Sequence, residues 1–247
     1  MLELCYNLQY MYNCFAEIIS ANRAGNAYDF VLRCPDAAKA ALVGQFVHIK
    51  ADGFYLRRPI SICEISGDCL RIIFEVRGDG TAELAKLSAG DKVDILAPLG
   101  KGFTIPDGEI FVCGGGIGVP PLLEVVKQAE SAKAFLGFRN AESVILQEDF
   151  SKLCDTTVTL EPEFVTVPLR NALEKNRPMA VLACGPMAML KAVATLAEEF
   201  DVPCQVSLEQ RMACGVGACL VCSCQTKYGV KHVCKDGPVF DAREVAW

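Results

Sequence analysis

The spacing of four cysteines near the C-terminus constrains this chain more than any other feature. The run reads Cys214-x4-Cys219-x2-Cys222, and eleven residues separate Cys222 from Cys234. This is the ligand spacing of plant-type [2Fe–2S] clusters. The small residues between the first two cysteines allow a loop to curl tightly, so that backbone N–H groups point at the sulfurs. The spacing therefore predicts a one-electron carrier in this part of the chain.

A zinc site and a disulfide knot are the alternatives for these cysteines. Zinc sites usually combine two Cys-x2–4-Cys knuckles, and this segment contains one. A disulfide scaffold is typical of short secreted chains, whereas this chain has 247 residues and starts without a basic segment followed by an apolar run. We therefore expect a reducing cytoplasm. In it, eight other cysteines act as small apolar residues: Cys5, Cys14, Cys34, Cys63, Cys69, Cys113, Cys154 and Cys204.

Composition argues against two classes of partner. The net charge of −6 provides no electrostatic footprint for nucleic acid. No stretch approaches the roughly 20 apolar residues that a membrane span requires. The two histidines, His48 and His232, have no partners at the spacing of a metal site or a catalytic triad. We expect neither nucleic-acid binding, nor membrane insertion, nor hydrolysis.

Three regions follow one another, which predicts an α+β multidomain chain. Residues 1–104 contain short alternating segments such as Tyr28–Arg33 and Leu70–Arg77, typical of an antiparallel β-barrel. Residues 105–203 alternate strands such as Ile110–Cys113 with helical runs such as Met187–Glu199, which predicts a parallel α/β nucleotide-binding domain. Residues 204–247 form a module around the cysteine loop.

A glycine-rich loop follows the first strand of the α/β region. It reads Cys113-Gly-Gly-Gly-Ile-Gly-Val-Pro-Pro121 and opens a helix. Glycines let the backbone approach a phosphate, and a helix N-terminus offers N–H groups and a positive dipole end. The loop is not a Rossmann fingerprint, because prolines stand where the third glycine and the helix start would be. A tight strand–helix turn without a ligand is the alternative.

A second short motif, Cys184-Gly185-Pro186, stands at the end of another predicted strand. Ligands of open α/β sheets bind outside the carboxyl ends of the strands. We expect this motif and the glycine loop to converge on one nucleotide. Alone, the tripeptide could also be a simple helix cap.

Two motifs in the barrel region have weaker signals. Arg57-Arg-Pro-Ile-Ser-Ile62 offers a guanidinium for a phosphate and a hydroxyl for a ring edge, yet the pattern alone favours a solvated strand end. Gly78-Asp-Gly-Thr81 stands at the start of a short predicted helix, so it is either a second phosphate-binding site or an ordinary helix N-cap.

In order and content, these motifs resemble the ferredoxin–NADP reductase superfamily. With the cysteine loop, and with segments such as Glu209–Cys219 and Val233–Phe240, the chain resembles the family of dihydroorotate dehydrogenase B electron-transfer subunits over nearly its whole length. Members of the related NAD(P)H–ferredoxin or sulfide oxidoreductase branch tend to replace the first cluster cysteine with aspartate. Cys214 therefore favours the dihydroorotate branch over that rival. A non-catalytic redox sensor is a third, weaker hypothesis.

The resemblance assigns residues to cofactors. By this resemblance, Cys214, Cys219, Cys222 and Cys234 ligate the cluster, and we expect Cys224 not to ligate. Our own hypothesis is that Cys184 is the catalytic-site residue beside the nicotinamide, where it shapes the pocket and does not act as a covalent nucleophile. Phe74-Glu75 stands where the family often has Tyr-Arg, so Glu75 is expected to contribute only its backbone. The nucleotide-binding residues are Arg58, Pro59, Ile60, Ser61, Ile73, Phe74, Glu75, Gly80 and Thr81 for FAD, and Gly114, Gly115, Gly116, Gly118, Gly185 and Pro186 for NAD.

The resemblance also implies a route for electrons. A partner subunit oxidises dihydroorotate on FMN, as a heterotetramer with two copies of each chain. Electrons then pass through the cluster and FAD to NAD+ as the substrate. A flavin exchanges both single electrons and hydride, so FAD is expected between the nicotinamide site and the cluster. The residues alone leave the choice between NAD and NADP open, and the resemblance favours NAD.

Overall fold

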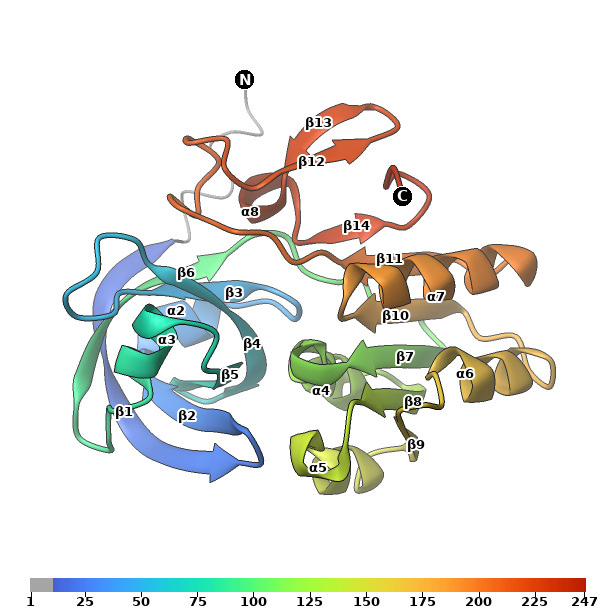
Figure 1. Cartoon of the computed structure of the whole chain (residues 1–247), viewed down its shortest axis with the longest axis horizontal. Helices are drawn as coiled ribbons and strands as arrows, with labels where there is room; N and C mark the ends of the chain where they lie inside the picture. Colours follow the sequence, from blue (N-terminus) through green and yellow to red (C-terminus); the bar gives the residue numbers. More distant parts are fainter. Residues whose placement is uncertain (1–10) are drawn as a thin grey trace.

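The computed structural model describes residues 11–247, which form three packed parts (Figure 1). Cys5 lies outside the described residues. The first part is the predicted antiparallel barrel, closed in the strand order β1-β2-β5-β4-β3-β6. In β2, Phe30 and Leu32 are buried inside the barrel and alternate with more exposed neighbours. The elements are β1 (Tyr12–Ala24), β2 (Ala27–Arg33), α2 (Pro35–Ala40), β3 (Phe46–Ile49), β4 (Arg58–Ser66), β5 (Cys69–Glu75), α3 (Asp79–Leu84) and β6 (Lys92–Leu99).

The second part is the predicted parallel sheet, with the strand order β14-β11-β10-β7-β8-β9. Every pair is parallel except β11 with β14. The sheet continues beyond residue 203, because β11 pairs with β10 and β14 pairs with β11. The strands are β7 (Glu109–Gly115), β8 (Ser131–Phe138), β9 (Asp155–Leu160), β10 (Ala180–Cys184), β11 (Cys204–Ser207) and β14 (Val239–Asp241).

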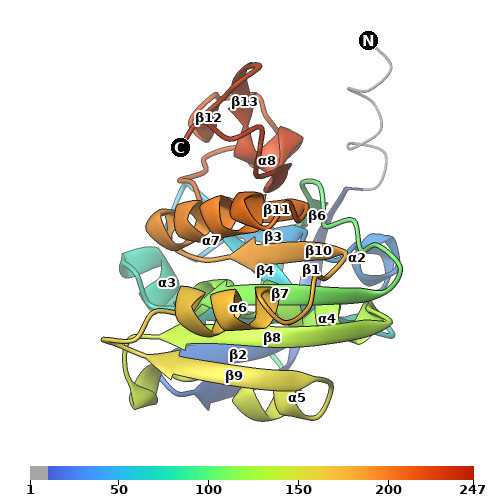
Figure 2. The ribbon, with the colours of Figure 1, turned by 90° about the vertical axis from the view of Figure 1, so that its right-hand side faces the viewer.

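Helices cover both faces of this sheet. The face toward the barrel carries α4 (Pro121–Gln128) and α5 (Gln147–Ser151), which share a core with the outer barrel residues Cys63 and Ile73. The opposite face carries α6 (Thr166–Leu173) and α7 (Met187–Glu199), which lie together in Figure 2. Two short 3-10 turns, η1 (Gly116–Gly118) and η2 (Ala141–Ser143), complete the connections. Among residues 11–247, no helix has the length and apolar character needed to cross a bilayer.

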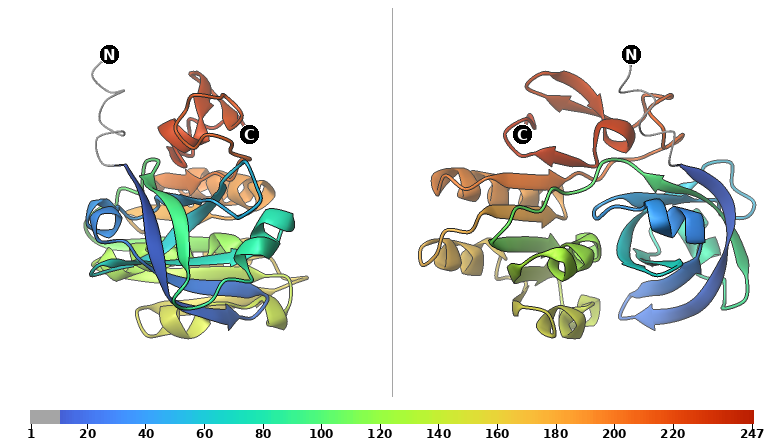
Figure 3. Two further views of the ribbon diagram at one scale, coloured as in Figure 1. Left: turned by 90° about the vertical axis from the view of Figure 1, so that its left-hand side faces the viewer. Right: turned by 180° about the vertical axis from the view of Figure 1, so that it is seen from behind.

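The third part lies over the end where the barrel and the sheet meet (Figure 3). It consists of the cysteine loop, β12 (Ser223–Thr226), β13 (Gly229–His232) and α8 (Val233–Asp236). The barrel residues Phe46 and Leu99 share one hydrophobic core with Cys222 and Cys234 of this part and with the α7 face of the sheet. The cysteine loop is therefore packed against both larger parts.

Charged side chains fasten the barrel to the α/β part. The buried Glu124 of α4 accepts a hydrogen bond from the backbone N–H of Ile65 in β4 at 3.0 Å. Nearby, Lys127 pairs with Glu64 at 2.9 Å. Burial raises the pKa of Glu64, but its contacts with Lys127 and Arg71 outweigh burial and lower that pKa below its usual value. These contacts fix the distance between the two walls of any site that the parts share.

We predict that Glu124→Ala lowers the free energy of unfolding by about 1–3 kcal/mol, because the Ile65 N–H loses its acceptor in a poorly hydrated contact. Urea denaturation monitored by fluorescence measures the change. Glu17→Ala is the matched control, since Glu17 forms an exposed pair with Arg33 at 3.4 Å and such pairs contribute less than about 1 kcal/mol. Equal losses in the two variants would contradict the proposed role of Glu124.

Candidate functional site

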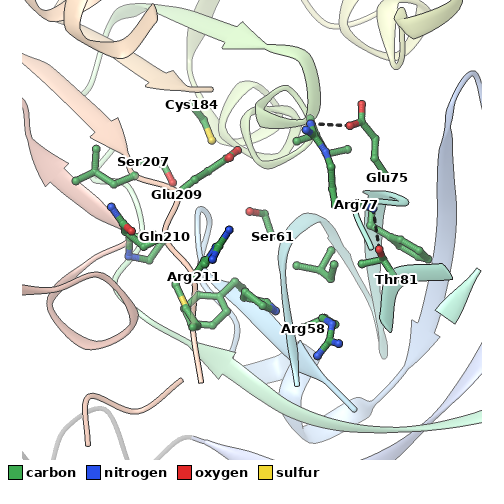
Figure 4. A pocket seen from close by; sticks show the side chains of 18 of the residues that line it. Arg58, Ser61, Glu75, Arg77, Thr81, Cys184, Ser207, Glu209, Gln210 and Arg211 are labelled. Carbon is green, nitrogen blue, oxygen red and sulfur yellow. Dashed lines mark hydrogen bonds and ion pairs between the residues drawn. The ribbon is translucent and has the colours of Figure 1, made fainter. Parts of the chain in front are cut away.

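A pocket of about 550 Å³ lies where the three parts meet (Figure 4). One wall comes from β4 and β5 of the barrel, and the opposite wall comes from Cys184 and from residues 207–212, which begin at the last residue of β11. Pockets of this size, largely apolar with a few polar groups, are typical of cofactor sites. The pocket is therefore the candidate site for the nucleotide cofactors.

The barrel wall contains the predicted Arg58, Pro59, Ile60 and Ser61. The Arg58 guanidinium lies over the Phe54 ring at 5.0 Å and donates a hydrogen bond to the Leu56 carbonyl at 2.5 Å. The Ser61 hydroxyl lies at the pocket surface in Figure 4. Arg58 and Ser61 thus present a cation and a hydroxyl to the same space.

The neighbouring Arg57 has a different role. Its guanidinium donates to both carboxylate oxygens of Asp94 on β6, at 2.8 and 2.9 Å, and to the Asp94 carbonyl at 3.0 Å. Such bidentate pairs fix geometry strongly. The motif is therefore not a solvated strand end: one arginine fastens the barrel strands together, and the next faces the pocket.

Three other predicted residues, on β5 and α3, have contacts within the protein itself. The Phe74 ring packs inside the barrel, 5.5 Å from the Tyr28 ring. The Thr81 hydroxyl accepts the Arg77 N–H at 2.8 Å and so closes its own turn. A Cβ at Gly80 would overlap the Arg58 guanidinium, so this glycine makes room for Arg58. What Phe74, Gly80 and Thr81 offer a cofactor is mainly backbone, while Ile73 lines the pocket beside them.

Glu75 has a partner in the pocket that the sequence did not reveal. Its carboxylate pairs with Arg77 at 2.7 Å, and both residues line the pocket (Figure 4). Across the pocket, burial raises the pKa of Glu209; Arg77 opposes this shift and the negative charge of Glu75 adds to it. A positive charge thus remains near Glu75 although that position itself is acidic.

The structure brings the glycine loop and the Cys184 motif together. In the sheet, Cys184 is paired with Gly114 on one side and with Ser207 on the other. A Cβ at Gly118 would lie 2.5 Å from the Cys184 carbonyl group, so only glycine permits this close approach. Gly115 similarly packs against Pro186, and a Cβ there would lie 3.0 Å from the proline ring.

Only part of the glycine loop is open to a ligand. Gly116 has φ +52°, and a Cβ there would meet no atom within 4 Å, so its backbone is accessible. Gly114, Gly115 and Gly185 instead lie against neighbouring side chains. The loop therefore combines the two roles considered from the sequence, a tight strand–helix turn and a phosphate-binding loop. Most of its glycines permit close packing, and the backbone of Gly116 remains available to a phosphate.

Cys184 forms part of the pocket wall as a neutral thiol. It is buried, and burial together with the negative charge of Glu209 raises its pKa to about 12, although its contact with Ser207 opposes the shift. A thiol with this pKa is a poor nucleophile at neutral pH. Its position suits shaping the pocket and not covalent catalysis.

In the cysteine loop, backbone N–H groups point at the sulfurs. The Cys214 sulfur accepts from Val216 at 3.4 Å and from Ala218 at 3.3 Å. The Cys234 sulfur accepts from Gly217 at 3.1 Å. Burial raises the pKa of the Cys214 thiol, but these N–H groups and Cys219 outweigh it and lower the pKa to about 7. The N–H groups thus stabilise negative charge on the Cys214 sulfur, whereas burial and the neighbouring Cys222 raise the pKa of Cys234 to about 12.

The four cysteines lie as two pairs. Cys214 lies beside Cys219, and Cys234 lies beside Cys222, whose sulfur also accepts the backbone N–H of Cys234 at 3.4 Å. Among the residues that the structure describes, no group of three or more His, Cys, Asp or Glu side chains is placed to hold a metal ion. Two pairs of thiols surrounded by N–H donors fit a two-iron cluster, which takes four cysteine ligands. Cys224, on β12, is half-buried, and burial raises its pKa.

Residues 207–212 form the part of the site that the sequence analysis did not assign. Ser207, Glu209, Gln210 and Arg211 line the pocket together with Arg77. Only their position in the sequence could have indicated this role, because the segment runs directly into Cys214. Because it continues from the end of β11, which lies between β10 and β14, it forms a wall of the pocket before it enters the cysteine loop.

Comparisons with known proteins agree with these features. The sequence model of the iron–sulfur cluster binding domain of dihydroorotate dehydrogenase B matches residues 209–246. The chain is 43% identical over 226 residues to the electron transfer subunit of dihydroorotate dehydrogenase B (NAD(+)) of Enterococcus faecalis, covering 82% of this chain and 86% of that protein. It is 35% identical over 246 residues to the Desulforamulus reducens protein of the same name, covering 91% and 94%.

A solved structure is similar over nearly the whole chain. It is that of an NADH-dependent reduced ferredoxin–NADP oxidoreductase, described for flavin-based electron bifurcation. The TM-score is 0.85 at 28% identity, and the match covers 95% of this chain and 90% of that one. The barrel, the parallel sheet and the third part therefore form an arrangement that a known flavin enzyme shares.

We predict that replacing Cys214, Cys219, Cys222 or Cys234 with serine removes most of the bound iron and the cluster's share of the visible absorption, while the FAD absorption remains, because each change removes one of four thiolate ligands. Iron analysis and visible spectra of the purified proteins measure the loss. Cys224→Ser is the matched control and should keep both signals. Loss of iron from the Cys224 variant, with iron retained in one of the four, would show that the ligand set is wrong.

Proposed function

The chain belongs to the family of dihydroorotate dehydrogenase B electron-transfer subunits, and from this we propose that it carries electrons from a dihydroorotate-oxidising partner to NAD+. The observation that carries the proposal is the path of residues 207–214. This segment leaves the sheet beside Cys184, lines the nucleotide pocket and reaches Cys214 of the cluster loop. The pocket and the loop therefore adjoin each other along one short stretch of chain, as electron transfer between them requires.

The residues of the pocket suit FAD on the barrel side and NAD on the sheet side. When bound, FAD supplies two-electron exchange with NAD and one-electron exchange with the cluster. Arg58 offers its cation to the phosphates, and the Ser61 hydroxyl can hydrogen-bond a ring edge. Gly116 offers an open backbone to the second nucleotide, and Cys184 limits where its ring can lie.

The cluster loop is accessible to a partner. Cys219 is exposed, and the next two residues, Leu220 and Val221, are 60% and 54% exposed. An exposed cluster ligand flanked by apolar side chains suits docking of an electron donor. We propose an FMN-containing catalytic subunit as this partner, in a heterotetramer with two copies of each chain. We also propose a reducing cytoplasmic compartment, since all thirteen described cysteines are free thiols.

One observation favours a second candidate function. The structural similarity to a ferredoxin–NADP oxidoreductase covers 95% of the chain, which would suit the small subunit of an NAD(P)H–ferredoxin or sulfide oxidoreductase. The sequence relatives named above are closer, at 35% and 43% identity. Cys214 also retains the ligand that this branch tends to replace. We therefore prefer the dihydroorotate function.

The decisive experiment is to purify the chain with its tightly associated proteins and to add dihydroorotate and NAD+. We expect NADH to accumulate, measured by its absorbance. In the Cys214→Ser complex, dihydroorotate should still reduce the partner's flavin, while NADH formation falls at least tenfold because the route is interrupted. If the complex with intact FAD and cluster forms no NADH but reduces ferredoxin with NADPH, the second candidate function replaces the first.

We further predict that Cys184→Ala slows NADH-driven flavin reduction roughly tenfold, or ~1.4 kcal/mol in the barrier, because the nicotinamide loses a wall that orients it. FAD should remain bound, since Cys184 lies opposite the barrel wall. Stopped-flow absorbance measures the rate. Cys204→Ala is the control, a buried thiol at the start of β11 outside the pocket lining. Unchanged reduction kinetics in Cys184→Ala would contradict the assignment.

A further inference from the structure

His48 is a buried histidine whose ring makes no hydrogen bond. It lies on β3 with 0% exposure, and neither Nδ1 nor Nε2 has a partner. Among the described residues, Thr159 is the other buried side chain with such an atom. Leaving a buried polar group unpaired is destabilising, because the group loses its hydrogen bonds to water. An apolar side chain at position 48 would avoid that cost, so the imidazole calls for an explanation.

The position of the ring points to the cluster loop. Gly215 follows Cys214 and has φ +75°, and a Cβ at this glycine would lie 2.6 Å from His48 Nδ1. The backbone at Gly215 therefore passes directly over this edge of the ring. A residue with a side chain at position 215 would displace either His48 or the loop.

The other side of His48 leads to the nucleotide pocket. Its ring lies edge-on to Phe46, with 6.4 Å between the ring centres, and Phe46 lines the pocket. Both residues belong to β3 and project to the same side of the strand, as alternate residues do. His48 thus stands between the pocket and the cysteine loop, at the contact of the barrel with the third part.

The ring is neutral in this environment. Burial and the charge of Arg57 lower the pKa of His48 to about 4, although the nearby backbone of Arg57 and of Cys214 opposes this shift. A neutral imidazole carries one N–H, which can donate a single hydrogen bond. The sulfur contacts described above come from N–H groups of the third part itself, at Val216, Gly217, Ala218 and Cys234.

We propose that His48 is a positioning residue through which the barrel donates an Nδ1–H hydrogen bond to the cluster-loaded loop at Cys214–Gly215. Hydrogen bonds toward the ligands and sulfurs of a cluster stabilise its reduced, more negative state and raise its potential. The donor therefore favours electron acceptance by the cluster beside the flavin pocket. The inference rests on the cluster of the proposed function, and it does not depend on dihydroorotate as the substrate.

Three substitutions separate hydrogen bonding from packing. His48→Asn places an amide N–H near the position of Nδ1, His48→Gln places it near that of Nε2, and His48→Leu removes the donor. We expect the cluster potential to fall in the Leu and Gln variants and to stay near the wild-type value in the Asn variant. The measurement is a redox titration of the purified, cluster-loaded chain followed by electron paramagnetic resonance, with FAD and iron contents determined in parallel.

Thr159→Val is the control, because it also removes a buried unpaired polar atom, on β9 of the sheet. Its cluster potential should not change. The proposal is overturned if the Leu variant keeps the wild-type potential, or if all three His48 variants shift by the same amount, since packing would then explain the effect. If the Leu variant binds no cluster, the difference in cluster potential between the Asn and Gln variants tests the proposal instead. A wild-type chain that binds no cluster would instead refute the proposed function.

Discussion

The parallel pairing of β11 with β10 is the contact on which the rest of the site depends. It places Ser207 beside Cys184 and directs the following residues into the pocket. From there the chain reaches Cys214 without leaving the junction of the three parts. Without this pairing, the cysteine loop would have no fixed distance from the nucleotide pocket. Since electron transfer depends on such distances, one pair of strands connects the fold to the proposed function.

The thiols of this chain show how environment assigns different roles to one side chain. Burial raises the pKa of Cys34, Cys184 and Cys204 to about 12, so these residues are packing groups at neutral pH. Cys214 differs because converging N–H groups outweigh burial and lower its pKa to about 7. Cys234, another of the predicted ligands, differs from Cys214, because burial and the neighbouring Cys222 raise its pKa to about 12.

The sequence predicted the barrel, the parallel sheet and α7 because each has a strong periodic pattern. It missed β1, whose alternation is blurred by the exposed Phe15 and by the polar end Asn22–Arg23. It also missed the short helices α2, α5, α6 and α8, and it did not assign β11 to the sheet. Four residues such as Cys204–Ser207 carry too little pattern to indicate a strand, and only their neighbours in space make them one.

The sequence by itself determined which residues can do chemistry: the cysteine spacing, the glycine loop and the Arg-x-x-Ser motif are local patterns. Tertiary structure alone decided how they are used. It showed that Arg57 binds Asp94 while Arg58 faces the pocket, and that Arg77 stands beside the acidic Glu75. It also placed His48 against Gly215, more than 160 residues away along the chain. Spacing along a chain specifies ligands that share a loop, whereas contacts between strands and loops distant in sequence depend on how the sheets pair.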